Sequence, residues 1–475
     1  MIRPLGVRIR RAAAGVAVLL VVCAGLAGCG TYATESARIK AAVAGGDVER
    51  ALGEVGEVDD DDVLGLLQRG LLLFYAGRNV EAAQAFDRAY QRIDFLYGTD
   101  YVKEALSFLT NDAQRDYVGY PAEQVLLNTY GSLAYMAEGD LDKALVMARR
   151  ANTLLTRLAD VREDTEGYTD DAFAEWLAAM LYAEDGDANP CMVAARRALA
   201  SFREYEALWG QRVPSTFVQD YVVWARRFGF DDEADALVEE FGDVARLARP
   251  PRRDEGEVVV IYESGFVSHL QEVRLDWPIL ERDDDDGEDL ARRIYRRGPR
   301  HTFVVHDDVR VKYWLSVAMP VLAHTEPRLV EARLRAGDLA AFTEPVHDVS
   351  SIFELTFEEG AATRTIRTIV RALTKYQITQ AVREGKKKDD GTRETNEVAG
   401  FVANLFASAT ERADTRSWTT LPDTIHLARL RLPEGRHRLV LEVLDRSGKV
   451  AQTATYDDVV VVAGERTILH HRTYE

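Results

Sequence analysis

Apolar residues follow two different periods along this chain. From Val63 to Gly242 they recur at every third or fourth position and proline is sparse, which is the pattern of amphipathic helices. Beyond a Pro-rich, charged segment they form short β-branched runs or alternate with polar residues, as in strands. The two periods predict a helical region over 58–247 and, after a linker at 248–256, a region that contains sheets.

The helical region contains an internal repeat. Small residues, a bulky filler and a turn glycine recur in GLLLFYAGRNVEAAQAFDRAY, GSLAYMAEGDLDKALVMARRA and AAMLYAEDGDANPCMVAARRAL, and more weakly in WARRFGFDDEADALVEEF. In the first segment Gly70 lets two antiparallel helices approach, Phe86 fills the space between them, and Gly77 opens the turn. This arrangement predicts helix pairs of the tetratricopeptide (TPR) type, although the turn glycines depart from the regular TPR period of about 34 residues. A generic helical bundle is the alternative.

A helix pair of this kind cannot bury its apolar face alone, so the pairs should stack into an α-solenoid. Stacked pairs leave a concave groove that suits another polypeptide better than a reaction centre. We therefore expect the region to bind a protein partner through groove residues Tyr75, Tyr135 and Tyr182.

Residues 257–417 predict a mixed α/β domain. VVVIYESGF and TFVVHDDVRVKYWLSVAMP are strand-like, whereas LVEARLRAGDLAAF, AATRTIRTIVRALTKYQITQAVREG and NEVAGFVANLFASATERAD have helical patterns. The second of these helices has a basic face, because its cations are spaced three to four residues apart: Arg364, Arg367, Arg371 and Lys375. This face either contacts an acidic partner or anionic headgroups, or pairs with acids of the same chain.

The last segment, 418–475, alternates apolar and polar residues around Pro-Glu-Gly, Arg-Ser-Gly and Ala-Gly-Glu turns. That pattern predicts a small antiparallel, β-sandwich-like domain. The expected fold is thus α+β and multidomain, with an N-terminal TPR-like α-solenoid, a middle α/β segment and a C-terminal antiparallel β-domain.

The N-terminus predicts export and lipidation. A basic start, MIRPLGVRIRR, precedes a short apolar run that ends in Leu-Ala-Gly-Cys at Cys29, as in a bacterial lipoprotein signal over 1–28. Gly30 after the cysteine favours the outer membrane, facing the periplasm. Residues 29–57 would then be a tether and a first helix. An ordinary signal with a chance cysteine, or an N-terminal anchor, is the alternative.

Net charge and cysteine content argue against several kinds of binding and against a disulfide. The net charge is −19, which argues against nucleic-acid binding because that needs a basic footprint. It also argues against electrostatic attachment to anionic lipid, so the membrane link is expected to be the acyl chain on Cys29. Of the three cysteines, Cys23 would leave with the signal and Cys191 would be left as a small buried side chain, without a partner for a disulfide.

Motifs for catalysis are lacking in the sequence. It has no Gly-Lys-Ser/Thr phosphate loop, no His-Glu-x-x-His and no Gly-x-Ser-x-Gly. The nine histidines are scattered, and His470 and His471 alternate faces of a terminal strand. We therefore expect a non-enzymatic protein without cofactor or metal. An envelope enzyme, or a binding module acting on peptidoglycan or polysaccharide, is the alternative.

The string ERADTRSWTTLP, 411–422, predicts a structural joint. Asp414 and Arg416 can close a helix end by pairing charges. Trp418 would bury its ring between the last helix and the terminal strands, with Arg416 stacked on it. Leu421-Pro422 would force an extended exit. A partner-binding patch is the alternative.

The chain resembles a family of bacterial outer-membrane lipoproteins that contain TPR repeats. The likeness rests on NDAQRDYVGYPAEQVLLNTYGSLAYMAEGDLDKALVMARRA, on GEVVVIYESGFV and above all on the Asp-Thr-Arg-Ser-Trp and Leu-Pro signature of ERADTRSWTTLP. It implies an envelope lipoprotein. It implies no reaction, because the family has no assigned chemistry.

Overall fold

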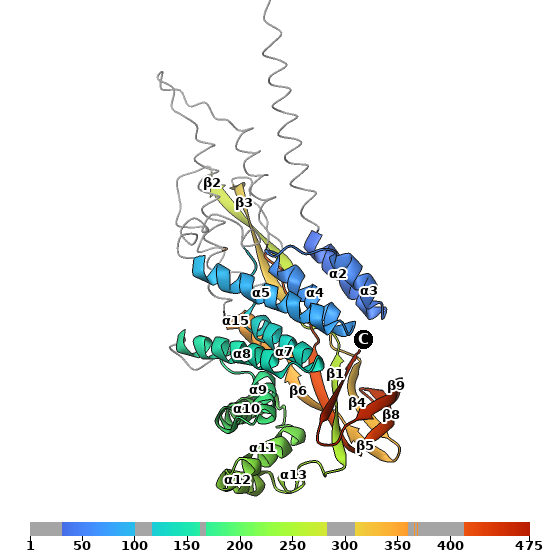
Figure 1. Cartoon of the computed structure of the whole chain (residues 1–475). Helices are drawn as coiled ribbons and strands as arrows, with labels where there is room; N and C mark the ends of the chain where they lie inside the picture. The colour runs from blue at the N-terminus through green and yellow to red at the C-terminus, as the bar shows by residue number, and fades with distance from the viewer. Residues whose placement is uncertain are drawn as a thin grey trace, which may run out of the picture.

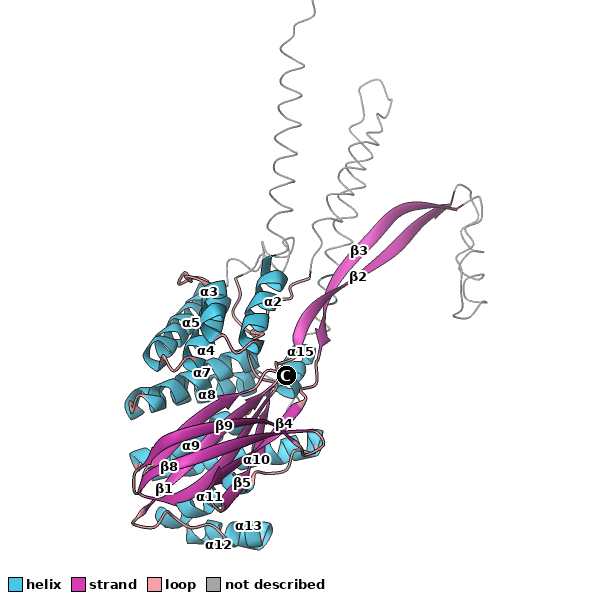
Figure 2. Cartoon of the chain, turned by 90° about the vertical axis from the view of Figure 1, so that its right-hand side faces the viewer, coloured by secondary structure: helices cyan, strands magenta, loops and turns pink. Residues whose placement is uncertain are grey.

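The computed structural model describes residues 31–99, 116–161, 168–282, 309–359 and 413–475, together with positions 365 and 368. In these ranges an array of helices packs against two four-stranded sheets, and a long two-stranded arm leaves the body (Figures 1 and 2). None of the helices described is long and apolar enough to cross a bilayer.

The helical array consists of antiparallel helix pairs. In chain order they are α2 (Thr31–Ala44) with α3 (Val48–Val55), α4 (Val63–Tyr75) with α5 (Asn79–Thr99), α7 (Pro121–Ala137) with α8 (Leu141–Val161), α9 (Ala172–Asp185) with α10 (Ala188–Trp209), and α11 (Ser215–Arg227) with α12 (Asp231–Phe241), followed by the short α13 (Asp243–Arg246). Gly77 adopts a φ of 71° in the turn of its pair, a conformation that favours glycine. At Gly70 an added Cβ would lie 2.6 Å from the Phe86 ring, so the small residue permits the close approach that the sequence predicted.

The segment expected to be a tether is part of the array. Helices α2 and α3 bury Ile39, Val43 and Ala51 in the same core as the other pairs. Ser36 also shares a 2.6 Å hydrogen bond with Thr419. The helical array therefore includes α2 and α3, which precede the predicted start at residue 58.

Two sheets pack face to face on one side of the helical array (Figure 2). The inner sheet has the order β10–β1–β7–β6, and the outer sheet has the order β5–β4–β8–β9. Their strands are β1 (Glu255–Ser264), β4 (Leu329–Ala336), β5 (Leu339–Phe342), β6 (Glu344–Asp348), β7 (Thr424–Pro433), β8 (Gly435–Asp445), β9 (Val450–Val461) and β10 (Arg466–Arg472). Val258, Tyr262, Leu334 and Leu441 belong to the core between the sheets.

The sandwich corrects two predictions. Because β1 pairs in parallel with β10 and antiparallel with β7, the predicted domain boundary at 417/418 separates strands that share one sheet. The segment LVEARLRAGDLAAF, predicted as a helix, forms the β4–β5 hairpin, which turns at Gly337 with a φ of 59°. Leucine and alanine favour helices, but Ala332 and Leu334 are fully buried against the other sheet, and such packing overrides a local preference.

The arm consists of β2 (His269–Arg282) and β3 (Val309–Ala323), which pair only with each other within the described ranges (Figure 2). Helix α15 (Val349–Glu359) lies near its base. The predicted basic helix face and most of the last predicted helix lie outside the described residues.

One face of the inner sheet lies against the first helices of the pairs. Val259, Ile261 and Leu427 of the sheet share a core with Leu133 of α7 and Trp176 of α9. The chain itself therefore fills much of the groove that the sequence predicted for a partner.

Candidate functional site

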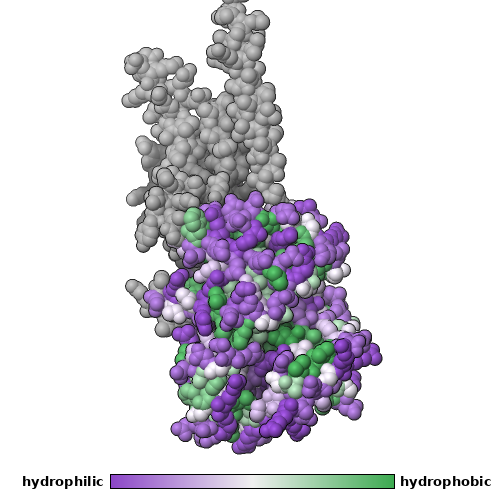
Figure 3. All heavy atoms as spheres, viewed as in Figure 1, coloured by the Kyte–Doolittle hydropathy of each residue, from purple (hydrophilic) through white to green (hydrophobic). Residues whose placement is uncertain are grey.

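A cleft of about 650 Å³ remains open where the helical array meets the edge of the inner sheet. Its helical wall comes from the ends of α4, α7 and α9 and the starts of α5 and α8, and its other wall is β10. On this side of the molecule apolar side chains gather between the helices and the sheets (Figure 3). The cleft is much larger than the cavity of about 30 Å³ beside Trp176 and the one of about 40 Å³ beside Tyr90, which makes it the candidate site.

The strand that forms one wall of the cleft is the edge of its sheet. Among the described strands β10 pairs with β1 alone. Consecutive strand residues point to opposite faces, yet Arg466, Thr467 and Ile468 all line the cleft. The cleft must therefore run along the edge of β10 and not over one face of the sheet.

A buried carboxylate lies behind the wall at one end of the cleft. Glu263 of β1 is fully buried and accepts hydrogen bonds from the hydroxyls of Tyr75 at 2.6 Å and Tyr130 at 2.7 Å. His470 Nε2 lies 3.2 Å from the carboxylate and Arg472 Nη1 lies 3.4 Å away. The ring of Tyr75 stacks on that of His470 with centroids 5.1 Å apart, and both rings line the cleft.

The charge of Glu263 is compensated by its neighbours. Burial alone would raise its pKa, but the His470 ring, the Arg472 guanidinium and the Tyr75 hydroxyl outweigh burial and hold the pKa at about 2. A carboxylate with so low a pKa is a poor general base at neutral pH. The cluster is therefore suited to fixing β1 and β10 to the helices rather than to transferring protons.

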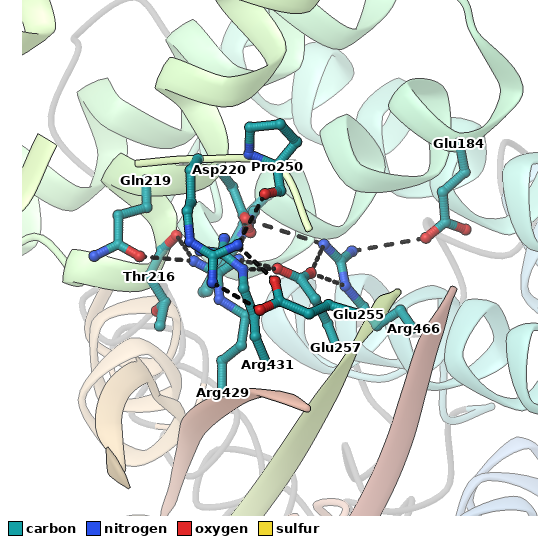
Figure 4. Close-up of polar contacts among 12 residues, drawn as sticks. Glu184, Thr216, Gln219, Asp220, Pro250, Glu255, Glu257, Arg429, Arg431 and Arg466 are labelled. Atoms are coloured by element: carbon teal, nitrogen blue, oxygen red, sulfur yellow. Dashed lines mark hydrogen bonds and ion pairs between the residues drawn. The ribbon is translucent and has the colours of Figure 1, made fainter. Parts of the chain in front are cut away.

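A second ionic cluster lies at the other end of the cleft (Figure 4). Arg466 of β10 is 3.0 Å from Glu257 and 3.6 Å from Glu184 at the end of α9. Arg429 of β7 contacts both Asp220 of α11 and Glu257. Arg431 of β7 lies 2.9 Å from Glu257. Burial would raise the pKa of Glu257, but Arg429, Arg466 and Arg431 outweigh it and hold that pKa well below the usual range. This cluster ties the opposite end of the inner sheet to the array.

The predicted joint is anchored in the helical array. Trp418 is fully buried and packs against Phe86 of α5 and Tyr130 of α7, with centroids 5.9 and 6.1 Å apart. Arg416 pairs with Asp414 at 2.8 Å, as predicted. Its guanidinium lies 5.4 Å from the ring of Tyr117, so the predicted stacking partner, Trp418, was wrong.

The predicted groove tyrosines lie in different surroundings. Tyr75 lines the cleft, but its hydroxyl is bonded to the chain's own Glu263. Tyr135 donates instead to Asp87 at 2.6 Å, and Tyr182 is buried. The three therefore do not form one surface for a partner. Cys29 and the basic-face residues Arg364, Arg367, Arg371 and Lys375 lie outside the described residues.

Neither ionic cluster was predicted from the sequence. A signal was present, because Glu257 and Glu263 flank the apolar run of β1 at positions of the same parity as Val259 and Ile261. Charges at such positions must face the array together with the apolar residues. His470 and His471 alternate faces, as predicted. His470 approaches Glu263, whereas His471 Nδ1 shares a 3.0 Å hydrogen bond with the hydroxyl of Tyr456 in the outer sheet.

No group of three or more histidine, cysteine or acidic residues that could hold a metal ion occurs in the described part of the chain. The arginines and carboxylates of the two clusters are paired with one another. The buried free thiol of Cys191 has a pKa raised by its burial to about 12, so it is inert at neutral pH.

No protein-family model matches the chain, and neither does any curated protein. Solved structures with similar helices include MamA from Desulfovibrio magneticus RS-1, which is 15% identical with a TM-score of 0.29 and covers 45% of this chain and 93% of its own. A putative kinesin light chain with TPR-like repeats from Podosopora anserina is 11% identical with a TM-score of 0.30, covering 44% and 93%. BtubC from P. vanneervenii is 17% identical with a TM-score of 0.28, covering 44% and 76%. These TM-scores are low, and the description of TPR-like pairs rests on the helices and turns of this chain.

Proposed function

We propose that this protein is a non-enzymatic scaffold of the cell envelope that binds a protein partner in assembly or regulation of an envelope structure. The observation that supports this most directly is the open cleft between the TPR-like helices and the edge strand β10. Stacked helix pairs suit the binding of extended polypeptides, and the charged groups of the two ionic clusters are engaged with one another. A partner would therefore bind in the cleft, which is the part of the groove that the inner sheet does not fill.

The proposal includes a lipid anchor at Cys29 and a location at the outer membrane, facing the periplasm. Its support is the lipoprotein signal and the resemblance given by ERADTRSWTTLP. Helix α2 starts two residues after Cys29 and is bonded to the joint through Ser36 and Thr419. An acyl chain at Cys29 would therefore hold the array close to the membrane.

Site-specific crosslinking tests the partner function. A photo-crosslinking amino acid at Asn79, which lines the cleft, should give a discrete crosslinked protein in intact cells. The same amino acid at Val193, which is 49% exposed on α10, is the matched control. Crosslinks that are absent at Asn79, or identical at both positions, would count against the proposed function.

A further inference from the structure

The edge of β10 has backbone groups available for another strand. Glu257 donates its amide to the carbonyl of Glu465 at 3.0 Å, and Thr473 donates its amide to the carbonyl of Glu263 at 2.9 Å. In a parallel pair alternate residues of a strand face the neighbour, so residues 466, 468, 470 and 472 direct their amides and carbonyls away from β1. No described backbone group pairs with them. The carbonyl of His470 receives a 3.5 Å contact from the Tyr456 hydroxyl.

Space for an added strand lies beside these groups. Neighbouring strands need a separation of about 4.8 Å, and the cleft follows the β10 edge at Arg466, Thr467 and Ile468. Across from them the wall contains Met136 and Leu141. A strand placed here would have its backbone on β10 and alternate side chains on an apolar wall, which is how peptides add to exposed sheet edges.

The charge around the cleft selects among peptides. Glu138 and Asp185 are exposed next to lining residues, and neither is paired with a cation in the ranges described. Glu184 and Arg466 both line the cleft and pair with each other at 3.6 Å, which leaves Glu138 and Asp185 as the acids available there. The chain as a whole has a net charge of −19. An incoming strand with Lys or Arg at its outward positions would be attracted, and an acidic one would be repelled.

We propose that an extended, basic segment of a protein partner adds to β10 as a fifth strand of the inner sheet. This inference rests on the proposed function and states how the partner binds. The partner's backbone pairs with residues 466, 468 and 470, its apolar side chains face Met136 and Leu141, and its cations face Glu138 and Asp185.

The test uses a displayed library of random ten-residue peptides, selected on the protein comprising residues 30–475. Selected peptides should be enriched in Lys and Arg that alternate with apolar residues. Their binding should slow hydrogen exchange of the Ile468 and His470 amides. Peptides without basic enrichment, or without protection of these two amides, would overturn the inference. Slow exchange of these amides before any peptide is added would mean that the chain covers its own edge, and would also overturn it.

A matched pair of variants isolates the backbone contribution. Ile468→Pro removes an amide that β1 does not use, and edge strands tolerate proline at such positions. Ile468→Ala removes the same packing but keeps the amide. We expect Ile468→Pro to bind a selected peptide at least tenfold more weakly than Ile468→Ala, whereas equal binding would contradict strand addition. The hydrogen-exchange result on the unaltered protein decides the matter if Ile468→Pro does not fold.

The crosslinking experiment separates the two proposals. Loss of the Asn79 crosslink in Ile468→Pro, with retention in Ile468→Ala, supports strand addition to β10. A crosslink that persists in Ile468→Pro would overturn strand addition and leave the partner function standing. A crosslink absent from the unaltered protein would instead count against the proposed function itself.

Discussion

The backbone amide of Trp418 donates a 2.5 Å hydrogen bond to Oε1 of Glu123, a residue 295 positions earlier in the chain. The same carboxyl accepts the Tyr117 hydroxyl at 2.5 Å and the Tyr120 amide at 2.7 Å. Burial nevertheless raises the pKa of Glu123 to about 7, and these donors only partly oppose that rise. The segment between the predicted last helix and β7 is thus fixed to the start of α7.

Replacing Trp418 with Ala should lower the free energy of unfolding by about 3–5 kcal/mol, because a fully buried indole leaves a cavity. Trp418→Phe should cost less, since the indole Nε1 has no hydrogen-bond partner among the described residues and a ring is retained. Urea denaturation followed by circular dichroism measures both. A loss below about 1 kcal/mol for Trp418→Ala would mean that the joint does not hold the array and the sandwich together.

Glu175 of α9 should make the protein less stable as the pH rises from 4.5 to 7. Burial, only partly opposed by Arg197, raises the pKa of this carboxyl from 4.5 to about 7. In that window the folded state keeps a proton that the unfolded state has released, so stability falls as the pH rises and levels off above pH 7. Glu175→Gln should therefore be more stable than the unaltered protein at pH 8, by about 1–3 kcal/mol, and nearly equal to it at pH 4.5.

Thermal unfolding across pH 4.5–8 checks the Glu175 prediction. Glu206→Gln, on the exposed face of α10, serves as the matched control and should leave the pH profile unchanged. If Glu175→Gln and the unaltered protein lose stability in parallel, another carboxyl, with Glu123 the first to test, is responsible for the decline.

Gly256 of β1 should not tolerate a side chain. An added Cβ would lie 2.3 Å from the carbonyl oxygen of Val462 and 3.2 Å from that of Glu465, and neither backbone can move away without disturbing the β9–β10 turn. Gly256→Ala should destabilise the protein by about 1–3 kcal/mol. Gly53→Ala, in α3 with no atom within 4 Å of the new Cβ, should instead stabilise it by about 0.5–1 kcal/mol. Two changes of the same sign in the denaturation midpoint would contradict this prediction.

Local patterns predicted the helix pairs because their signals lie within one repeat. The spacing of Gly70, Gly77 and Phe86 encodes a close approach and a turn, and neighbours in sequence are also neighbours in space there. The pairing of β1 with β10 has no such signal, since Glu263 and Arg472 are 209 positions apart and periodicity does not specify which strands pair. For the same reason the hairpin β4–β5 was predicted as a helix: its preference for a strand comes from the opposing sheet.

The candidate site was predictable only in part. Tyr75 was expected in the groove and does line the cleft. Its bonding partner Glu263 shares the parity of Val259 and Ile261, which indicates the face of β1 on which it lies. Only the register of β10 shows that His470 and Arg472 lie beside it. The inner sheet fills much of the groove through contacts between the two halves of the chain. The pattern of a single segment does not predict such contacts.

Lipidation at Cys29 predicts where the protein is found after cell fractionation. Cys29→Ala removes the thiol that would accept the acyl group, and an acidic surface offers little electrostatic attraction to anionic lipid. The variant should therefore appear in the soluble fraction or as uncleaved precursor, whereas the unaltered protein should sediment with membranes and incorporate radiolabelled palmitate. Cys191→Ala, at the buried free cysteine, is the control and should sediment normally. Palmitate incorporation into Cys29→Ala would place the anchor elsewhere.

Arg429 should be far more important for stability than an exposed arginine of the same sandwich. Its side chain is 6% exposed and contacts Asp220 and Glu257, which are 9% and 6% exposed. Arg429→Leu would leave those two carboxylates buried with less compensating charge, and removing one partner of a buried pair costs about 3–5 kcal/mol. Arg438 pairs with Asp457 at 3.2 Å, and both side chains are more than 70% exposed. Arg438→Leu should therefore lower the free energy of unfolding by only about 0–1 kcal/mol. A difference between the two variants of less than about 1 kcal/mol in urea denaturation would mean that solvent reaches the cluster. The Arg429 cluster would then contribute little to fastening the inner sheet to α11.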